Sequence, residues 1–134
     1  MNQSTKCTLI YGHHPRWTSG QHLNDSGLQP LWDIAYQYNV DVILKGHDHD
    51  YERFHPMGPT GNRDATRGID NVIVGTGGTG LRGFEQGILH PSSLVRNSTT
   101  WGVLKMTLNA DSYSAQFLPI AGQTFTDSWT RTCH

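Results

Sequence analysis

The sequence predicts an α/β domain that begins with a strand–helix–strand unit, and three observations support this prediction. Residues 7–12 read CTLIYG, an apolar and β-branched run that stops at a glycine, as a buried strand does. From Leu28 onward, apolar residues recur at steps of three and four, which is the period of an amphipathic helix. Residues 40–46 read VDVILKG, a second apolar run. Two strands joined through a helix are expected to be parallel neighbours in one sheet.

The helix between these strands has recognisable limits. Asp25 or Ser26 stands near its start, where short polar side chains cap helices, and Asn39 ends it, which gives about twelve residues. Residues 13–27 are rich in Pro, Gly, Ser and Asn, so we expect a long loop between the first strand and the helix.

The remainder of the chain is predicted to be mainly antiparallel. Residues 71–78 (NVIVGTGG) predict a short strand, set between turns and a glycine-rich loop. Residues 101–109 and 111–119 alternate apolar and polar side chains around a turn, as an antiparallel hairpin does. Residues 123–134 look like an irregular tail. The fold class is therefore α/β, a βαβ unit followed by mainly antiparallel strands, in a single unit over residues 1–134.

Glycines gather at residues 75–80 (GTGGTG), where two interpretations compete. The run is similar to a phosphate-cradling loop, but the Lys-Ser or Lys-Thr of a P-loop is missing and no helix-forming run follows it. We therefore expect a turn in which glycine allows another backbone to approach closely.

Composition excludes several classes of protein. The 134 residues are 35% hydrophobic and 16% charged, with a formal net charge of −1, which argues against a polybasic nucleic-acid binder and against a disordered chain. No apolar run approaches the roughly 18 to 20 residues that span a bilayer. We expect neither nucleic acid nor membrane as a partner. The first residues lack the apolar core of a signal peptide, so any export signal is expected outside this sequence.

The two cysteines lie at opposite ends of the sequence. Cys7 and Cys133 are too far from any CxxC partner to suggest a zinc knuckle or a redox pair. A disulfide between them is the favoured interpretation, because it would hold both tails, and two free thiols are the alternative.

Histidines follow both strands of the predicted βαβ unit. His13 comes after the first strand, and His47 and His49 flank an aspartate after the second. Sites in such sheets form beyond the carboxyl ends of the strands, and imidazole is a common ligand of divalent ions. The three rings are therefore predicted to meet at one edge of the sheet. A pair of hydrogen-bonded loop histidines is the alternative.

The surrounding residues carry a family resemblance. GHDHDYER at residues 46–53 resembles the GHxHxYER motif of purple acid phosphatases, and IYGH at residues 10–13, followed by Pro15, resembles the VxxH motif. Both motifs are typical of the metallophosphoesterase (calcineurin-like) superfamily, in its purple acid phosphatase-like branch. The resemblance implies an αββα sandwich and a phosphoric ester hydrolase with a dinuclear centre of iron, zinc or manganese.

The resemblance also implies roles for individual residues. His13 and His47 would bind one metal ion, and His49 the other. His22, in the loop after VxxH, is the candidate general acid. His14 and Arg16 are candidates for contacts with the phosphate ester substrate. Three further residues, Tyr51, Glu52 and Arg53, would orient the metal-binding loop, and Glu52 and Arg53 would form an ion pair beside it.

Three blocks of the family pattern have no counterpart in the sequence. The Asp, GDxxY and GNHD blocks, which supply the bridging carboxylate and other oxygen ligands, are missing. The chain therefore resembles the C-terminal half of the catalytic domain. We expect it to hold at most one ion and to be inactive alone. A non-catalytic metal-binding or interaction module is the main alternative, and a mononuclear zinc hydrolase using His13, His47 and His49 is the third.

Half of such a sandwich exposes apolar edges and faces. We therefore expect either a homodimer or association with the missing N-terminal half. The resemblance also implies a secreted or periplasmic protein.

Overall fold

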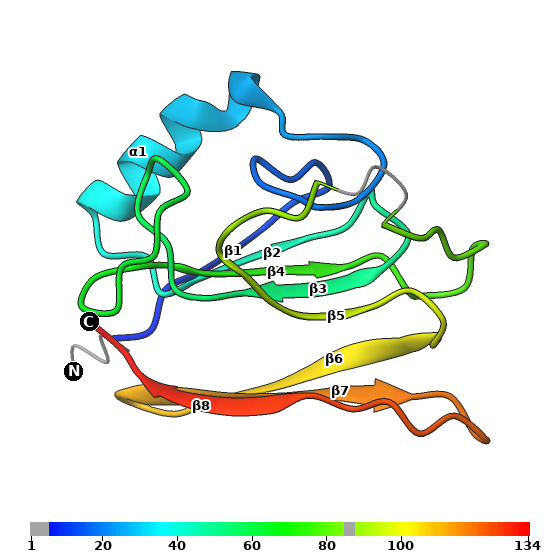
Figure 1. Ribbon diagram of the computed structural model, residues 1–134. Helices are drawn as coiled ribbons and strands as arrows, with labels where there is room; N and C mark the ends of the chain where they lie inside the picture. Colours follow the sequence, from blue (N-terminus) through cyan, green and yellow to red (C-terminus); the bar gives the residue numbers. More distant parts are fainter. Residues whose placement is uncertain (1–5, 85–87) are drawn as a thin grey trace.

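Two β-sheets and one helix form three stacked layers in the computed structural model, which describes residues 6–84 and 88–134 (Figure 1). The middle layer is a five-stranded sheet and the lower layer a three-stranded sheet, while helix α1 lies on the upper face. In spatial order the larger sheet contains β1 (Leu9–Tyr11), β2 (Val42–Lys45), β4 (Asp70–Val74), β3 (Tyr51–Phe54) and β5 (Ser93–Asn97). The smaller sheet contains β6 (Gly102–Leu108), β7 (Ser112–Pro119) and β8 (Ser128–Thr132).

The predicted βαβ unit is confirmed. Strands β1 and β2 are parallel, with Ile10 opposite Ile43, and β4 is parallel to β2 on its other side. Helix α1 (Gln29–Gln37) is shorter than predicted, because residues 26–28 form a 3₁₀ turn before it. The Asp25 side chain caps that turn by accepting a hydrogen bond from Gly27 N.

The two faces of the large sheet bury different cores. Ile43 faces α1 and packs in a cluster with Trp32 and Ala35 of the helix. Val42 faces the small sheet and packs with Tyr113 of β7. This explains why β2 is apolar on both sides, as strands inside layered α/β proteins are.

The hairpin of β6 and β7 follows the predicted turn, with Gly102 opposite Pro119 and Leu108 opposite Tyr113. The prediction of an irregular tail is wrong, because β8 pairs with β7 and completes the sheet. The glycine-rich stretch also contains β5, and β3 occupies the YERF segment. The layers are thus the α, β and β layers of the predicted sandwich. No helix of the described residues covers the outer face of β6–β8.

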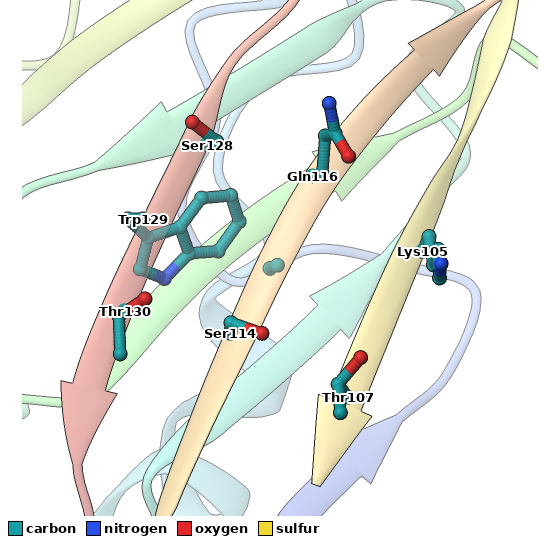
Figure 2. Close-up of a pocket in the computed structure, with 8 residues that line it drawn as sticks. Lys105, Thr107, Ser114, Gln116, Ser128, Trp129 and Thr130 are labelled. Atoms are coloured by element: carbon teal, nitrogen blue, oxygen red, sulfur yellow. The ribbon is translucent and has the colours of Figure 1, made fainter.

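That outer face is polar. A depression of about 550 Å³ lies on it. Figure 2 shows the side chains of β6, β7 and β8 that line this depression, and most of them are polar, as expected at a water-facing strand surface. The polar ones are Lys105, Thr107, Ser114, Gln116, Ser128 and Thr130.

A buried carboxylate joins the two sheets. Asp70 of β4 accepts hydrogen bonds from the Tyr113 hydroxyl, from Trp129 Nε1 at 3.0 Å and from Arg131 Nη1 at 2.6 Å. Asp70 is 4% exposed, so these donors from β7 and β8 compensate a charge that would otherwise be costly to bury.

A disulfide links Cys7 and Cys133, which confirms the favoured interpretation of the two cysteines. It connects the segment that enters β1 with the segment that leaves β8. Among the described residues, no helix is long and apolar enough to cross a membrane.

Candidate metal centre

The loops after β1 and β2 bring His13 and His47 together. Gly12 N donates to Leu44 O and Gly46 N donates to His13 O, both at 3.0 Å, so the two loops remain paired beyond the strands. His47 has a φ of 68°, in the left-handed region that is uncommon for residues other than glycine and that is often found at functional sites. Its Nδ1 lies 3.2 Å from Nε2 of His13.

His14 is the third member of this group. Ligand nitrogens of His13, His14 and His47 all lie within 4.8 Å of one another. The His14 ring centroid is 4.3 Å from that of His47. The resemblance had suggested a substrate contact for His14, and no spacing rule in the sequence singles it out as a ligand.

His49 lies outside this three-histidine group. Its Nδ1 is 2.9 Å from Gly80 O, in the glycine-rich loop after β4. In the return contact, Arg82 N donates to His49 O at 3.0 Å. The GHDH loop and the glycine-rich loop are therefore joined at two points.

His22 lies against the group, held by a buried aspartate. Its Nδ1 is 2.8 Å from Oδ1 of Asp48, and its ring centroid is 4.0 Å from that of His47. Asp48 is 1% exposed and also accepts a hydrogen bond from Thr18 Oγ1 at 2.5 Å. Asp48 was not predicted as a site residue, although its place between two predicted ligands was a signal.

Arg16 has its side-chain contacts outside the three-histidine group. Its Nε donates to Gln29 Oε1 at 2.9 Å, and its guanidinium lies 3.6 Å from the centroid of the Trp17 ring. Burial lowers the pKa of Arg16, against the opposing effect of Asp25 and Asp33.

Glu52 and Arg53 alternate across β3 and have different partners. Glu52 accepts from Ser19 and Ser93, whereas Arg53 binds Asp127 at 2.6 Å through Nε. The expected Arg–Glu pair beside the metal loop is therefore wrong, because neighbouring strand residues point to opposite faces.

Electrostatics favour a neutral imidazole at the centre of the group. Burial, together with the nearby His22, His14 and His13, lowers the pKa of His47. A neutral ring offers the lone pair that a metal ion needs.

The donor set fits one divalent ion. Two nitrogens on the same tetrahedral zinc lie about 3.3 Å apart, given zinc–nitrogen bonds of about 2.05 Å. The 3.2 Å between Nε2 of His13 and Nδ1 of His47 agrees with this.

Among the described residues no carboxylate joins the group. Asp50 is buried, and burial with the nearby Asp48 and Glu52 raises its pKa to about 8, so it is protonated at neutral pH. The described residues therefore do not fit a dinuclear centre by themselves.

A cleft of about 350 Å³ opens beside the histidines, which is ample for a phosphate group. It is smaller than the depression of Figure 2, but that depression has no titratable residue except a surface lysine. We therefore place the candidate site at the histidine cleft, which is lined by His14, His22, Leu23, Asn24, Asp25 and His47.

The fold and the histidine motifs are similar to those of the C-terminal region of purple acid phosphatases. The purple acid phosphatase PPD1 from yellow lupin (Lupinus luteus) seeds has the same fold, with a TM-score of 0.78 at 22% sequence identity. The match covers 98% of this chain and 26% of the lupin chain.

Curated relatives match shorter segments. An uncharacterized protein of Mycobacterium tuberculosis is 38% identical in an alignment of 71 residues that covers 41% of this chain and 13% of that protein. The "Probable inactive purple acid phosphatase 1" of Arabidopsis thaliana is 31% identical in an alignment of 88 residues that covers 60% of this chain and 14% of that protein. No protein-family model matches the chain. The resemblance to purple acid phosphatases is confirmed, over a small part of each curated relative.

Proposed function

We propose that this chain supplies the histidine part of a metal-dependent phosphoric ester hydrolase. The observation that carries the proposal is the 3.2 Å approach of His13 and His47 at the ends of two parallel strands. A metal ion at such a site binds phosphoryl oxygens and lowers the pKa of bound water. Three neutral imidazoles, from His13, His14 and His47, would hold one ion here.

His22 is positioned for proton transfer. Its Nδ1 faces Asp48, which leaves Nε2 directed to the other side of the ring. A carboxylate that holds an imidazole in this way fixes the orientation of the ring. We propose that His22 donates a proton from Nε2 to the leaving group of a phosphate ester.

The missing carboxylates would come from a second polypeptide segment. Strands β1 and β6 are the outer strands of their sheets and line one groove of about 300 Å³. Tyr11 and Val103 on its rim are 81% and 57% exposed. Apolar surface beside two open strand edges is typical of an interface.

We propose that this groove binds a segment equivalent to the N-terminal part of a purple acid phosphatase domain, which would supply the ligands of a second ion next to His49. The lupin chain is long enough to contain it, since this chain matches only 26% of its length. The dinuclear centre, of iron, zinc or manganese, would belong to that complete site.

A secreted or periplasmic location is part of the proposal. The Cys7–Cys133 disulfide supports it, because such bonds persist in oxidising compartments.

Hydrolysis of para-nitrophenyl phosphate tests the proposal. Turnover is measured with added zinc, manganese or iron for this chain alone and for a single-chain fusion carrying the N-terminal part of the lupin enzyme's domain. We expect activity in the fusion and its loss in the His22→Ala and His47→Ala forms. His55→Ala is the control, because His55 is outside the site. Turnover by the chain alone at the rate of the fusion would refute the need for a second segment.

A non-catalytic metal-binding or interaction module is the second candidate. It is favoured by the lack of a carboxylate in the described ligand group and by the Arabidopsis relative, whose name calls it inactive. Zinc binding without activity in any fusion, together with dimerisation of this chain through the β1–β6 groove, would support this candidate instead.

A further inference from the structure

We infer that Arg82 binds the phosphoryl group of the substrate, and that it selects monoesters over diesters. The inference deepens the proposed function and rests on it for the place of the reaction. Arg82 belongs to the glycine-rich loop after β4, and its Nη1 lies 3.1 Å from Nε2 of His22. In this contact, on the side of the ring opposite Asp48, the guanidinium donates and Nε2 accepts, so Nε2 is free to carry the proton for the leaving group only after Arg82 has turned to the phosphoryl group.

The loop that carries Arg82 is anchored next to the histidines. Arg82 N donates to His49 O at 3.0 Å, and Gly80 O is 2.9 Å from His49 Nδ1. One residue before Gly80, Thr79 O accepts from Trp101 Nε1 at 2.9 Å. The backbone of this loop is therefore held on both sides of Gly80. This fixes the position of the Arg82 backbone, from which the guanidinium extends.

The charge of Arg82 is not neutralised within the described part of the chain. Its polar side-chain contact there is with an imidazole, and no described carboxylate forms an ion pair with it. Asp48 lies beyond the His22 ring, and Asp25 of the cleft accepts a hydrogen bond from Gly27 N. A guanidinium has five N–H donors, so four remain for an incoming anion.

The geometry of the guanidinium points to a terminal phosphoryl group. Two parallel N–H groups match two oxygens of a phosphate, which a lysine cannot reproduce. A monoester presents three non-bridging oxygens and up to two negative charges, whereas a diester presents two oxygens and one charge. A single exposed cation beside imidazoles therefore favours the monoester.

Orthophosphate binding by this chain tests the inference without requiring turnover. Binding is followed by calorimetry and by shifts of the Arg82 Nε–Hε signal in nuclear magnetic resonance, with and without zinc. We expect Arg82→Gln to raise the Kd for orthophosphate at least about fivefold, and Arg82→Lys to raise it less. The control Arg63→Gln removes the same charge from an exposed arginine that donates to Pro91 O, and it should change the Kd less than about twofold.

Dimethyl phosphate provides the comparison with diesters. It should bind more weakly than orthophosphate, and its Kd should respond less to Arg82→Gln. Equal orthophosphate binding by the unmodified chain and Arg82→Gln, equal losses in Arg82→Gln and Arg63→Gln, or no binding by the unmodified chain would each overturn the inference. Zinc affinity is measured on the same samples. If zinc binding fails while Arg82-dependent phosphate binding persists, the proposed metal site is wrong and the inference about Arg82 stands.

Discussion

Nδ1 of His47 lies 3.2 Å from Nε2 of His13, although 34 positions separate the two residues in the sequence. The approach depends on two parallel strands that end side by side and on the left-handed backbone of His47. The adjacent His14 completes a group of three imidazoles, and five predictions follow from this site and from the contacts that support the two sheets.

Substitution of His14 should weaken zinc binding more than substitution of His49. His14→Ala removes one of three grouped imidazoles and should weaken zinc binding by at least about tenfold, as measured by competition with a chromophoric chelator. His49→Ala should change it less than about threefold, because His49 faces Gly80 O instead. Equal effects of the two substitutions would contradict the three-histidine group.

Gly75 should be intolerant of any side chain. A Cβ at this position would lie 1.7 Å from the backbone oxygen of Asp48, in the loop that carries His47 and His49. Gly75→Ala should therefore lower the free energy of unfolding by about 2 kcal/mol or more and weaken zinc binding as well. Gly77→Ala is the matched control, since a Cβ there meets nothing within 4 Å. Urea titration of both variants measures the difference.

Asp70→Ala should destabilise the contact between the sheets. It leaves the Tyr113 hydroxyl, Trp129 Nε1 and Arg131 without their shared acceptor, at an expected cost of about 3 kcal/mol. Asp111→Ala removes an exposed carboxylate and should change the free energy of unfolding by less than about 0.5 kcal/mol. Similar midpoints of thermal unfolding for the two variants would show that the cluster contributes little.

The ionised Asp127 side chain should make the free energy of unfolding fall at low pH. Burial alone would raise the pKa of Asp127, but hydrogen bonds from Arg53 and Tyr51 outweigh it and hold the pKa below the ordinary 3.8. The stabilisation is therefore complete above about pH 4 and is lost as the pH falls through the lower folded-state value. Asp127→Asn should cost about 1 to 2 kcal/mol at pH 7, and its difference from the unmodified chain should shrink below pH 4. Denaturant titrations between pH 2 and 7 measure the free energy of unfolding of both proteins. A difference between them that stays constant over this range would contradict the role of Asp127.

Reduction of the disulfide should lower stability at every pH where folding is measured. Cys7 and Cys133 are 126 positions apart, and closing a loop of this length stabilises the folded chain by about 4 to 5 kcal/mol in the chain-entropy model. The Cys7→Ser and Cys133→Ser variant should unfold at a lower urea concentration than the oxidised chain. It should match the reduced chain, and a midpoint unchanged by reductant would argue against the bond.

Periodicity predicted the βαβ unit well because its strands and helix each have an apolar pattern of their own. Strand β8 escaped prediction because Ser128, Thr130 and Thr132 are polar and exposed, so only Trp129 and Arg131 face the core. Such a strand is stabilised by pairing with β7 and not by its own hydrophobicity. Strand β5 was missed for a similar reason, because its five residues, SLVRN, include only two apolar ones.

The sequence predicted the type of ligand at the site, histidine, but it did not predict correctly which histidines lie together. Strand ends correctly brought His13 and His47 into contact, but the choice between His14 and His49 depends on loop torsions that no spacing rule describes. Asp48 and Arg82 reach His22 from segments that are 26 and 60 positions away. Contacts of this range come from the tertiary structure, so the sequence alone did not indicate Arg82, and it marked Asp48 only by its place between two predicted ligands.

The bond between Cys7 and Cys133 brings the two Cα atoms to 5.1 Å, so the fold is nearly a closed ring. A short linker between the flanking residues would make the ring continuous. New ends could then be opened in the exposed turn at Ala121 and Gly122, between β7 and β8. In such a circular permutant β8 would come first along the polypeptide, yet every strand would keep its neighbours.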